Sequence, residues 1–221
     1  MNHARKLVAT SLVSAAILLP AGTVYAEDLA VNITPKIASV EVTHNGKKTT
    51  IMRNQDQKNT VSKDFAVTSR KCPPFCIQPA TLAPGVETIG ELEVLEYLAK
   101  INAGDSNILV IDSRTPDWVK KGTIPGAVNI PWTSLNPLQG ADPMSITEIM
   151  EDQFNVKTLE GLWDFSDAKT LVLFCNGMWC GQSPNNILNL LKFGYPPHKL
   201  KWYRGGMQDW EILGLTTVPG V

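Results

Sequence analysis

Between residues 84 and 221, short apolar runs alternate with amphipathic stretches. The runs at residues 107–112 (NILVID) and 171–174 (LVLF) contain few polar residues, which is typical of strands buried on both faces of a sheet. Weaker runs at residues 126–131 and 201–203 predict two further strands.

Three stretches with apolar residues at helical spacing lie among these strands. They cover residues 89–99, 183–193 and 207–213, and the last follows a predicted turn at Arg204-Gly205-Gly206. Strands that alternate with helices form a mostly parallel sheet that is covered on both faces. The pattern therefore predicts an α/β fold, in which functional loops lie beyond the carboxyl ends of the strands.

The chain before this domain has a different pattern. Residues 39–54 form two β-rich runs around Asn45-Gly46, and this dipeptide between strands predicts a hairpin. Polar residues 54–63 predict a loop, and the two prolines within residues 72–76 (CPPFC) predict a rigid turn. We therefore expect an N-terminal extension, residues 27–83, before the domain of residues 84–221.

One segment of the domain does not follow the alternation. Residues 137–165 form an insertion between two predicted strands, and we expect a short helix within it at residues 146–154.

Residues 1–26 predict a cleaved signal peptide. Arg5 and Lys6 precede an uncharged apolar run at residues 7–19, and Val24-Tyr25-Ala26 has the small residues of a cleavage site. The alternative, an uncleaved membrane anchor, is disfavoured because the run is short for a membrane span. We expect export to the periplasm and no stable membrane insertion after cleavage.

Composition and charge narrow the class of protein. The chain of 221 residues is 43% hydrophobic and 19% charged, as in soluble globular proteins, and its formal net charge is −1. It has neither a basic run nor an acidic tail. We therefore exclude nucleic acid as a partner.

The four cysteines occur as two close pairs, Cys72 with Cys76 and Cys175 with Cys180. The spacings and surroundings are unlike those of zinc ligands, so we predict no metal. In an oxidising compartment such pairs form disulfides. Cys72 and Cys76 are a disulfide candidate with a structural role; the alternative is a redox pair that exchanges with the active site.

Cys175 is the main candidate for chemistry. It follows a buried strand and precedes a loop, with Gly177 and Gly181, that leads into a helix. Backbone N–H groups converge at such a position and favour a thiolate, so we expect a lowered pKa for Cys175. The alternative is an inert, buried cysteine.

Several motifs in this order resemble the rhodanese family, over residues 86–218. They are Asp112-Ser-Arg114, residues 122–127 (GTIPGA) with residues 129–131 (NIP), Phe174-Cys175, and residues 200–210 (LKWYRGGMQDW). The resemblance implies a rhodanese-like fold and a sulfurtransferase without a cofactor. In this family the loop cysteine, here Cys175, carries sulfane sulfur as a persulfide from a small donor to a thiol acceptor.

The resemblance also implies a set of site residues. Backbone N–H groups of the loop would stabilise the persulfide and bind the substrate, and Asp112 and Arg114 would brace the site. The loop candidates are Asn176, Gly177, Met178, Trp179, Gly181 and Gln182.

The loop departs from the family in length and charge. Gln182 occupies the position of the family's arginine, and six residues rather than four separate it from Cys175. A neutral amide lacks the bidentate contact that holds thiosulfate or phosphate. This disfavours thiosulfate as the donor, and phosphatase or arsenate-reducing activity.

The second loop cysteine keeps three hypotheses open. In the first, the protein is a periplasmic sulfurtransferase that uses Cys175. In the second, Cys180 forms a disulfide with Cys175, and the protein serves a periplasmic redox partner or senses oxidation. In the third, the fold is a non-catalytic binding module.

Overall fold

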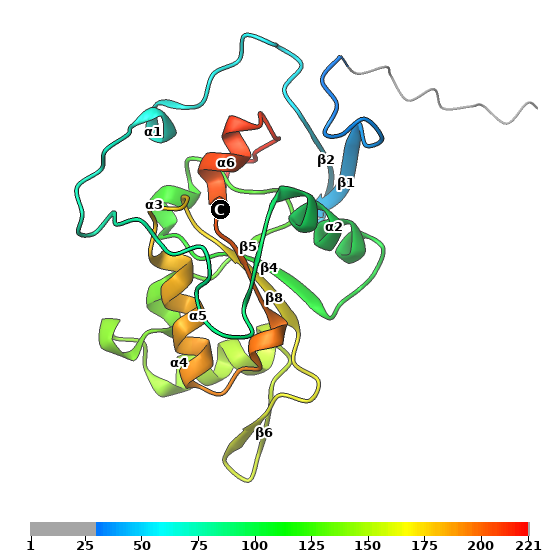
Figure 1. Cartoon of the computed structure of the whole chain (residues 1–221). Helices are drawn as coiled ribbons and strands as arrows, with labels where there is room; N and C mark the ends of the chain where they lie inside the picture. Colours follow the sequence, from blue (N-terminus) through cyan, green and yellow to red (C-terminus); the bar gives the residue numbers. More distant parts are fainter. Residues whose placement is uncertain (1–29, 221) are drawn as a thin grey trace, which may run out of the picture.

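The computed structural model describes residues 30–220 and centres on a five-stranded sheet (Figure 1). The strand order is β3-β9-β8-β4-β5, and every neighbouring pair is parallel. The predicted α/β class is therefore confirmed. The predicted signal peptide lies outside the described residues. The strands are β3 (Glu87–Ile89), β4 (Ile108–Asp112), β5 (Val128–Asn129), β8 (Thr170–Phe174) and β9 (Leu200–Tyr203).

The sheet separates two hydrophobic cores because successive side chains of a strand point to opposite faces. On β8, Val172 and Phe174 join one core, whereas Leu171 and Leu173 join the other. Helices α2 (Glu91–Asn102) and α6 (Gly206–Ile212) cover the first face, and α4 (Pro143–Glu148) and α5 (Gln182–Lys192) cover the second. None of the helices in the described part of the chain is long and apolar enough to cross a membrane.

The N-terminal extension begins with the predicted hairpin, formed by β1 (Ser39–His44) and β2 (Lys47–Met52). Asn45 and Gly46 both have positive φ, at 48° and 74°, as this two-residue turn requires. Val42 and Ile51 are buried in the same core as α2. The hairpin therefore packs on the domain.

After the hairpin the chain runs around one side of the domain before it enters the sheet (Figure 1). This coil includes the single-turn helix α1 (Lys63–Ala66), whose Phe65 is buried in the first of the two cores, next to Trp118. A second short helix, α3 (Pro116–Val119), follows β4.

The N-terminal hairpin and the C-terminal segment that follows α6 are joined by hydrogen bonds. The backbone N–H of Met52 donates to the hydroxyl of Thr216 at 3.0 Å, and the N–H of Thr216 donates to the carbonyl of Met52 at 3.0 Å. The N–H of Asn54 also donates to the carbonyl of Gly214, at 2.6 Å.

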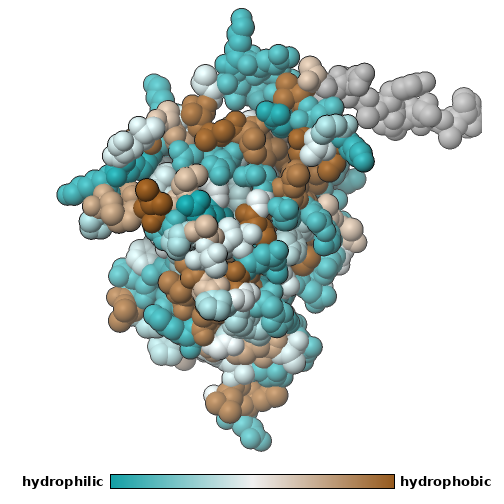
Figure 2. Space-filling model, in the orientation of Figure 1, coloured by the Kyte–Doolittle hydropathy of each residue, from teal (hydrophilic) through white to brown (hydrophobic). Residues whose placement is uncertain are grey.

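The insertion contains a hairpin that the sequence pattern did not predict. After α4 come a π-helical turn (Ile149–Gln153) and the antiparallel strands β6 (Lys157–Leu159) and β7 (Leu162–Asp164). Leu159 and Leu162 are 56% and 74% exposed, so the hairpin lacks the alternation of a buried strand. Apolar side chains are visible where this hairpin projects (Figure 2).

Three predicted boundaries are wrong. Ile89 ends β3 instead of starting a helix, because α2 begins after Gly90, whose N–H donates to Glu93 at 3.0 Å. The strand predicted at 126–131 is only Val128–Asn129, since Gly126 has a φ of 88° and proline lacks an N–H. Gly206, placed in a turn, is the first residue of α6. Short 3₁₀ turns occupy Trp132–Leu135, Pro137–Gln139 and Pro197–Lys199.

Candidate active site

The candidate site lies at the carboxyl edge of the parallel sheet. Phe174, the last residue of β8, pairs with Asp112 at the end of β4 and with Tyr203 at the end of β9. Cys175 follows at once, and α5 begins at Gln182. The loop between them, residues 175–181, therefore lies at the edge where ligands bind in such sheets.

The start of α6 holds the loop in place. The N–H groups of Met207 and Gln208 donate to the carbonyls of Cys175 and Asn176, each at 2.9 Å. Gly206 has a φ of 57°, and a Cβ there would collide with the carbonyl of Cys175. Only glycine lets the two backbones approach this closely.

The sulfur of Cys175 is buried between several hydrogen-bond donors and one acceptor, the carbonyl of Cys180 at 3.3 Å. Burial alone raises the pKa of Cys175, but donation from the Cys180 thiol, from the Ser183 hydroxyl and N–H, and from the Gly177 N–H outweighs it and lowers the pKa to about 7. The Ser183 hydroxyl lies 3.1 Å from the sulfur. The predicted lowering of the pKa agrees with this geometry.

Ser183 was not among the candidates from sequence. The sequence feature that could have indicated Ser183 is a hydroxyl in the first turn of the helix that follows the loop, where side chains approach the end of the strand. Trp202 on β9 fixes this hydroxyl by donating its indole N–H to it at 3.2 Å.

Cys180 is a second free thiol beside the first. Burial, the hydrogen bond with Cys175 and the negative charge of Cys175 raise the pKa of Cys180 well above its usual value. The thiol of Cys180 lies 3.7 Å from the side-chain oxygen of Gln182. The pair is thus asymmetric: Cys175 loses its proton near neutral pH, whereas Cys180 retains its proton.

Asp112 and Arg114 lie behind the loop as a buried ion pair. Both are 1% exposed, and the Arg114 guanidinium donates to the Asp112 carboxylate at 2.6 and 2.9 Å. Arg114 also reaches the side-chain oxygen of Asn176 at 3.4 Å, and the Thr123 hydroxyl donates to Asp112 at 2.7 Å. Arg114 thus contacts the loop and Asp112 holds Arg114, and neither residue lines the cavity described below.

A cavity of about 480 Å³ opens over the loop. Four of the predicted loop residues line it: Asn176, Cys180, Gly181 and Gln182. Cys175 lies beneath them, and Met178 and Trp179 are not part of the lining. The remaining lining residues are Pro74, Phe75, Thr115, Trp118, Trp132 and Asn185.

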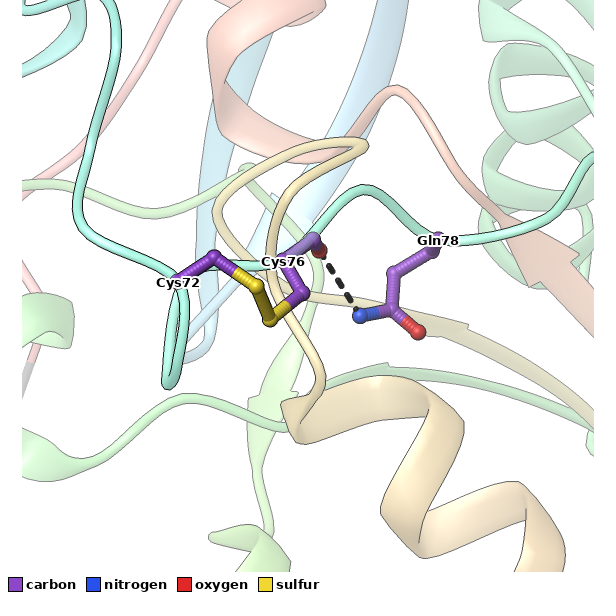
Figure 3. The surroundings of a disulfide bond; sticks show 3 residues. All are labelled: Cys72, Cys76 and Gln78. Carbon is purple, nitrogen blue, oxygen red and sulfur yellow. Dashed lines mark hydrogen bonds between the residues drawn. A yellow bond between two sulfur atoms is a disulfide. The ribbon is translucent and has the colours of Figure 1, made fainter.

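The N-terminal extension supplies one wall of this cavity. The predicted disulfide between Cys72 and Cys76 is formed, and its turn lies beside the loop that leads into α5 (Figure 3). The side-chain amide of Gln78 donates to the carbonyl of Cys76 at 2.9 Å, and the Gln78 N–H donates to the carbonyl of Met178 at 2.8 Å. The alternative role, exchange between this disulfide and Cys175, stays a hypothesis.

Aromatic contacts add to this attachment. The rings of Phe75 and Trp179 meet edge to face with centroids 5.5 Å apart, and the Arg70 guanidinium lies 4.4 Å from the Trp179 ring. The extension thus packs against the active-site loop. Within residues 30–220, no group of three or more potential metal ligands comes together.

Comparison with known proteins identifies the family of this domain. Residues 94–213, more than half of the chain, match the model of the rhodanese-like domain. No curated protein matches the chain.

Several solved structures are similar to part of the chain. A Bacillus halodurans protein is 19% identical with a TM-score of 0.39, covering 57% of this chain and 71% of that one. A human single-domain sulfurtransferase is 20% identical, with a TM-score of 0.38 and coverage of 57% and 96%. A Pseudomonas aeruginosa thiosulfate sulfurtransferase is 17% identical with a TM-score of 0.41, and the match covers 62% of this chain and 21% of that one. On the family match over residues 94–213, the chain belongs to the rhodanese-like family.

Proposed function

We propose that the protein is a rhodanese-type sulfurtransferase that carries sulfane sulfur as a persulfide on Cys175. One observation carries the proposal: the Ser183 hydroxyl lies 3.1 Å from the Cys175 sulfur, and with the Cys180 thiol and the N–H groups of Gly177 and Ser183 it outweighs burial and the Cys180 carbonyl at 3.3 Å. These donors favour a negative charge at this sulfur. A persulfide anion needs the same stabilisation one atom further out.

The reaction needs no external oxidant or reductant. In the first half, the Cys175 thiolate attacks the outer sulfur of the donor, the donor's sulfur–sulfur bond breaks, and the leaving group departs with the electron pair. In the second half, a thiophilic acceptor attacks the outer sulfur of the persulfide. The Cys175 thiolate leaves with the electron pair, so that the enzyme is regenerated.

Export to the periplasm is part of the proposal. It is supported by the charge and apolar pattern of residues 1–26 and by the Cys72–Cys76 disulfide, because disulfides persist in oxidising compartments. Fractionation of cells that produce the protein, with N-terminal sequencing of the periplasmic form, tests it. We expect the mature chain to start at Glu27; recovery only in the cytoplasm with residues 1–26 attached would contradict export.

A second candidate function is thiol–disulfide exchange, favoured by the asymmetry of the two loop thiols. Cys175 has a pKa of about 7, and its neighbour Cys180 has a raised pKa. In this reaction the Cys175 thiolate attacks a partner's disulfide and releases one partner thiolate. Cys180 then loses its proton and attacks Cys175, so that the partner is reduced and the loop cysteines are oxidised to a disulfide.

Intact mass and sulfur release distinguish these functions. The purified protein is incubated with a sulfane-sulfur donor, and its mass and cyanide-dependent sulfur release are measured for the wild type, Cys175→Ser and Cys180→Ser. A gain of one sulfur atom that is lost only in Cys175→Ser, with turnover, supports the sulfurtransferase. A loss of two hydrogens that needs both cysteines supports the redox function. Neither change would leave a binding module.

A further inference from the structure

We propose that the cavity above the loop binds the apolar organic body of the sulfur donor. The donor is an organic sulfane-sulfur compound, such as a thiosulfonate with a ring-sized substituent, in place of inorganic thiosulfate. The inference rests on the proposed sulfur transfer and names its substrate class.

The cavity walls are aromatic and uncharged. Phe75 and Pro74 of the extension face the cavity together with Trp118 and Trp132 of the domain, and none of the lining residues is charged. The cavity of about 480 Å³ has the size of a small-molecule site and exceeds the needs of a small inorganic anion. Burial of a hydrocarbon group against these rings is favourable, whereas an ion would lose water without gaining a counter-charge.

The nearby cations do not line the cavity, and Arg70 and Lys121 lie behind its aromatic wall. Arg114 is paired with Asp112 beneath the loop, and Lys121 is paired with Asp64 at 3.1 Å. Arg70 lies 4.4 Å from the Trp179 ring and 5.6 and 5.9 Å from the rings of Phe75 and Trp118. None of these three cations lines the cavity. A dianion such as thiosulfate would be repelled by the Cys175 thiolate twice as strongly as a monoanion at the same distance.

Neutral donors are available for a sulfonyl group. The side-chain oxygen of Asn185 accepts hydrogen bonds from Asn136 and Asn189, each at 3.0 Å, so its amide nitrogen remains as a donor at the cavity. Gln182 also lines the cavity, with its side-chain oxygen 3.7 Å from the Cys180 sulfur. Uncharged amide donors suit the polar end of an organic thiosulfonate, and the aromatic wall suits its body.

Phe75 is held in position before any ligand binds. The Cys72–Cys76 disulfide closes its turn, its ring contacts Trp179, and Gln78 joins the segment to the loop at Met178. A wall that is already ordered loses little conformational entropy on binding, which favours recognition of a ring.

Three donors separate the contributions of ring and charge. Benzenethiosulfonate and methanethiosulfonate carry the same charge and the same transferable sulfur and differ in the ring; thiosulfate carries one more negative charge. In each case Cys175 takes the outer sulfur, and a sulfinate or sulfite leaves with the electron pair. The kcat/KM of each donor is divided by its rate with a free thiol, which removes intrinsic reactivity.

We expect this normalised kcat/KM to be about tenfold higher for benzenethiosulfonate than for methanethiosulfonate, because the ring is buried in the cavity. Phe75→Ala should lower this ratio about threefold through loss of the aromatic contact, with Phe75→Leu in between. Leu138→Ala, at a side chain that is 88% exposed and outside the cavity, is the control and should keep the ratio.

The outcomes separate this inference from the function on which it rests. Two results with sulfur transfer would overturn the inference and leave the proposed sulfurtransferase function intact. One is a preference for the ring no larger than that of a free thiol; the other is a higher normalised kcat/KM for thiosulfate than for the thiosulfonates. A ratio that is unchanged in Phe75→Ala would also overturn it. Transfer from none of the three donors would overturn the proposed function itself.

Discussion

The Ser183 hydroxyl lies between two side chains, accepting from the indole N–H of Trp202 at 3.2 Å and facing the sulfur of Cys175 at 3.1 Å. Because the indole occupies an acceptor position of the hydroxyl, the Ser183 proton is directed toward the sulfur. A side chain on a neighbouring strand thus orients the donor that favours the Cys175 thiolate.

Replacement of Ser183 by alanine should raise the pKa of Cys175. The thiolate fraction grows as pH rises through the pKa, so the rate of alkylation of Cys175 by iodoacetamide should have its midpoint near pH 7 in the wild type. Loss of a hydrogen bond to a charged group should move this midpoint upward by about one unit. Peptide mapping by mass spectrometry separates Cys175 from Cys180.

Ser113→Ala is the matched control for this experiment. Ser113 is also fully buried, next to Asp112, but its hydroxyl has no hydrogen-bond partner in the described structure. Its replacement should leave the alkylation midpoint where it is. Equal midpoints for Ser183→Ala and the wild type would contradict the role of the hydroxyl.

Asp112→Asn should destabilise the protein by about 3 kcal/mol, because it leaves the buried charge of Arg114 without its counter-ion. Chemical denaturation measures the free energy of unfolding. Glu96→Gln is the control, since the ion pair of Glu96 with Lys100 is exposed and its loss should change stability very little. A similarly small effect at Asp112 would show that the buried pair is not required.

Gly206→Ala should lower the free energy of unfolding by more than the strain of a positive φ alone explains. Gly46 also has positive φ, but a Cβ there would meet no atom within 4 Å, so Gly46→Ala should cost about 1 kcal/mol of unfolding free energy. At Gly206 the added Cβ collides with the carbonyl of Cys175, and the cost should reach roughly 3 kcal/mol. If thermal denaturation gave equal losses, the close approach of α6 to the loop would be unimportant.

Acidification should weaken the attachment of the N-terminal hairpin. The N–H of Gly126 donates to Nδ1 of His44 at 3.1 Å, and partial burial lowers the pKa of His44 from 6.5. The unfolded chain then binds a proton more readily than the folded one, so stability present above pH 6.5 is lost as pH falls toward the folded pKa.

Denaturation of His44→Gln at several pH values should show a smaller loss between neutral and mildly acidic pH. His198→Gln, at an exposed position, should retain the wild-type dependence. An unchanged profile in His44→Gln would assign the acid sensitivity to other groups.

The buried strands could be predicted because they are apolar on both faces. Residues 107–112 and 171–174 stand out as runs, and Cys175 follows one of them, so the place of the nucleophile candidate also follows from the pattern. The strand β3 and the hairpin of β6 and β7 could not be predicted, because each strand has three residues and the hairpin exposes its leucines. The formation of such short elements depends on their contacts with neighbouring elements and is not visible in their own sequence.

The residues of the cavity wall could not be predicted from local sequence patterns either. Phe75 lies far from Cys180 in sequence, and only the path of the extension around the domain brings the two to one cavity. The role of Ser183 was missed for a similar reason. A serine in the first helical turn is common, and its distance to Cys175 depends on the tertiary fold.

The hydrogen bonds between Met52 and Thr216 join residues that are 164 positions apart. During synthesis the hairpin is therefore made well before the segment that pairs with it. Contacts of such long sequence separation form slowly, because a large loop must close first. A nascent chain therefore carries Val42 and Ile51 without their full cover until the segment around Leu215 has been made, and apolar surface exposed in this way favours aggregation.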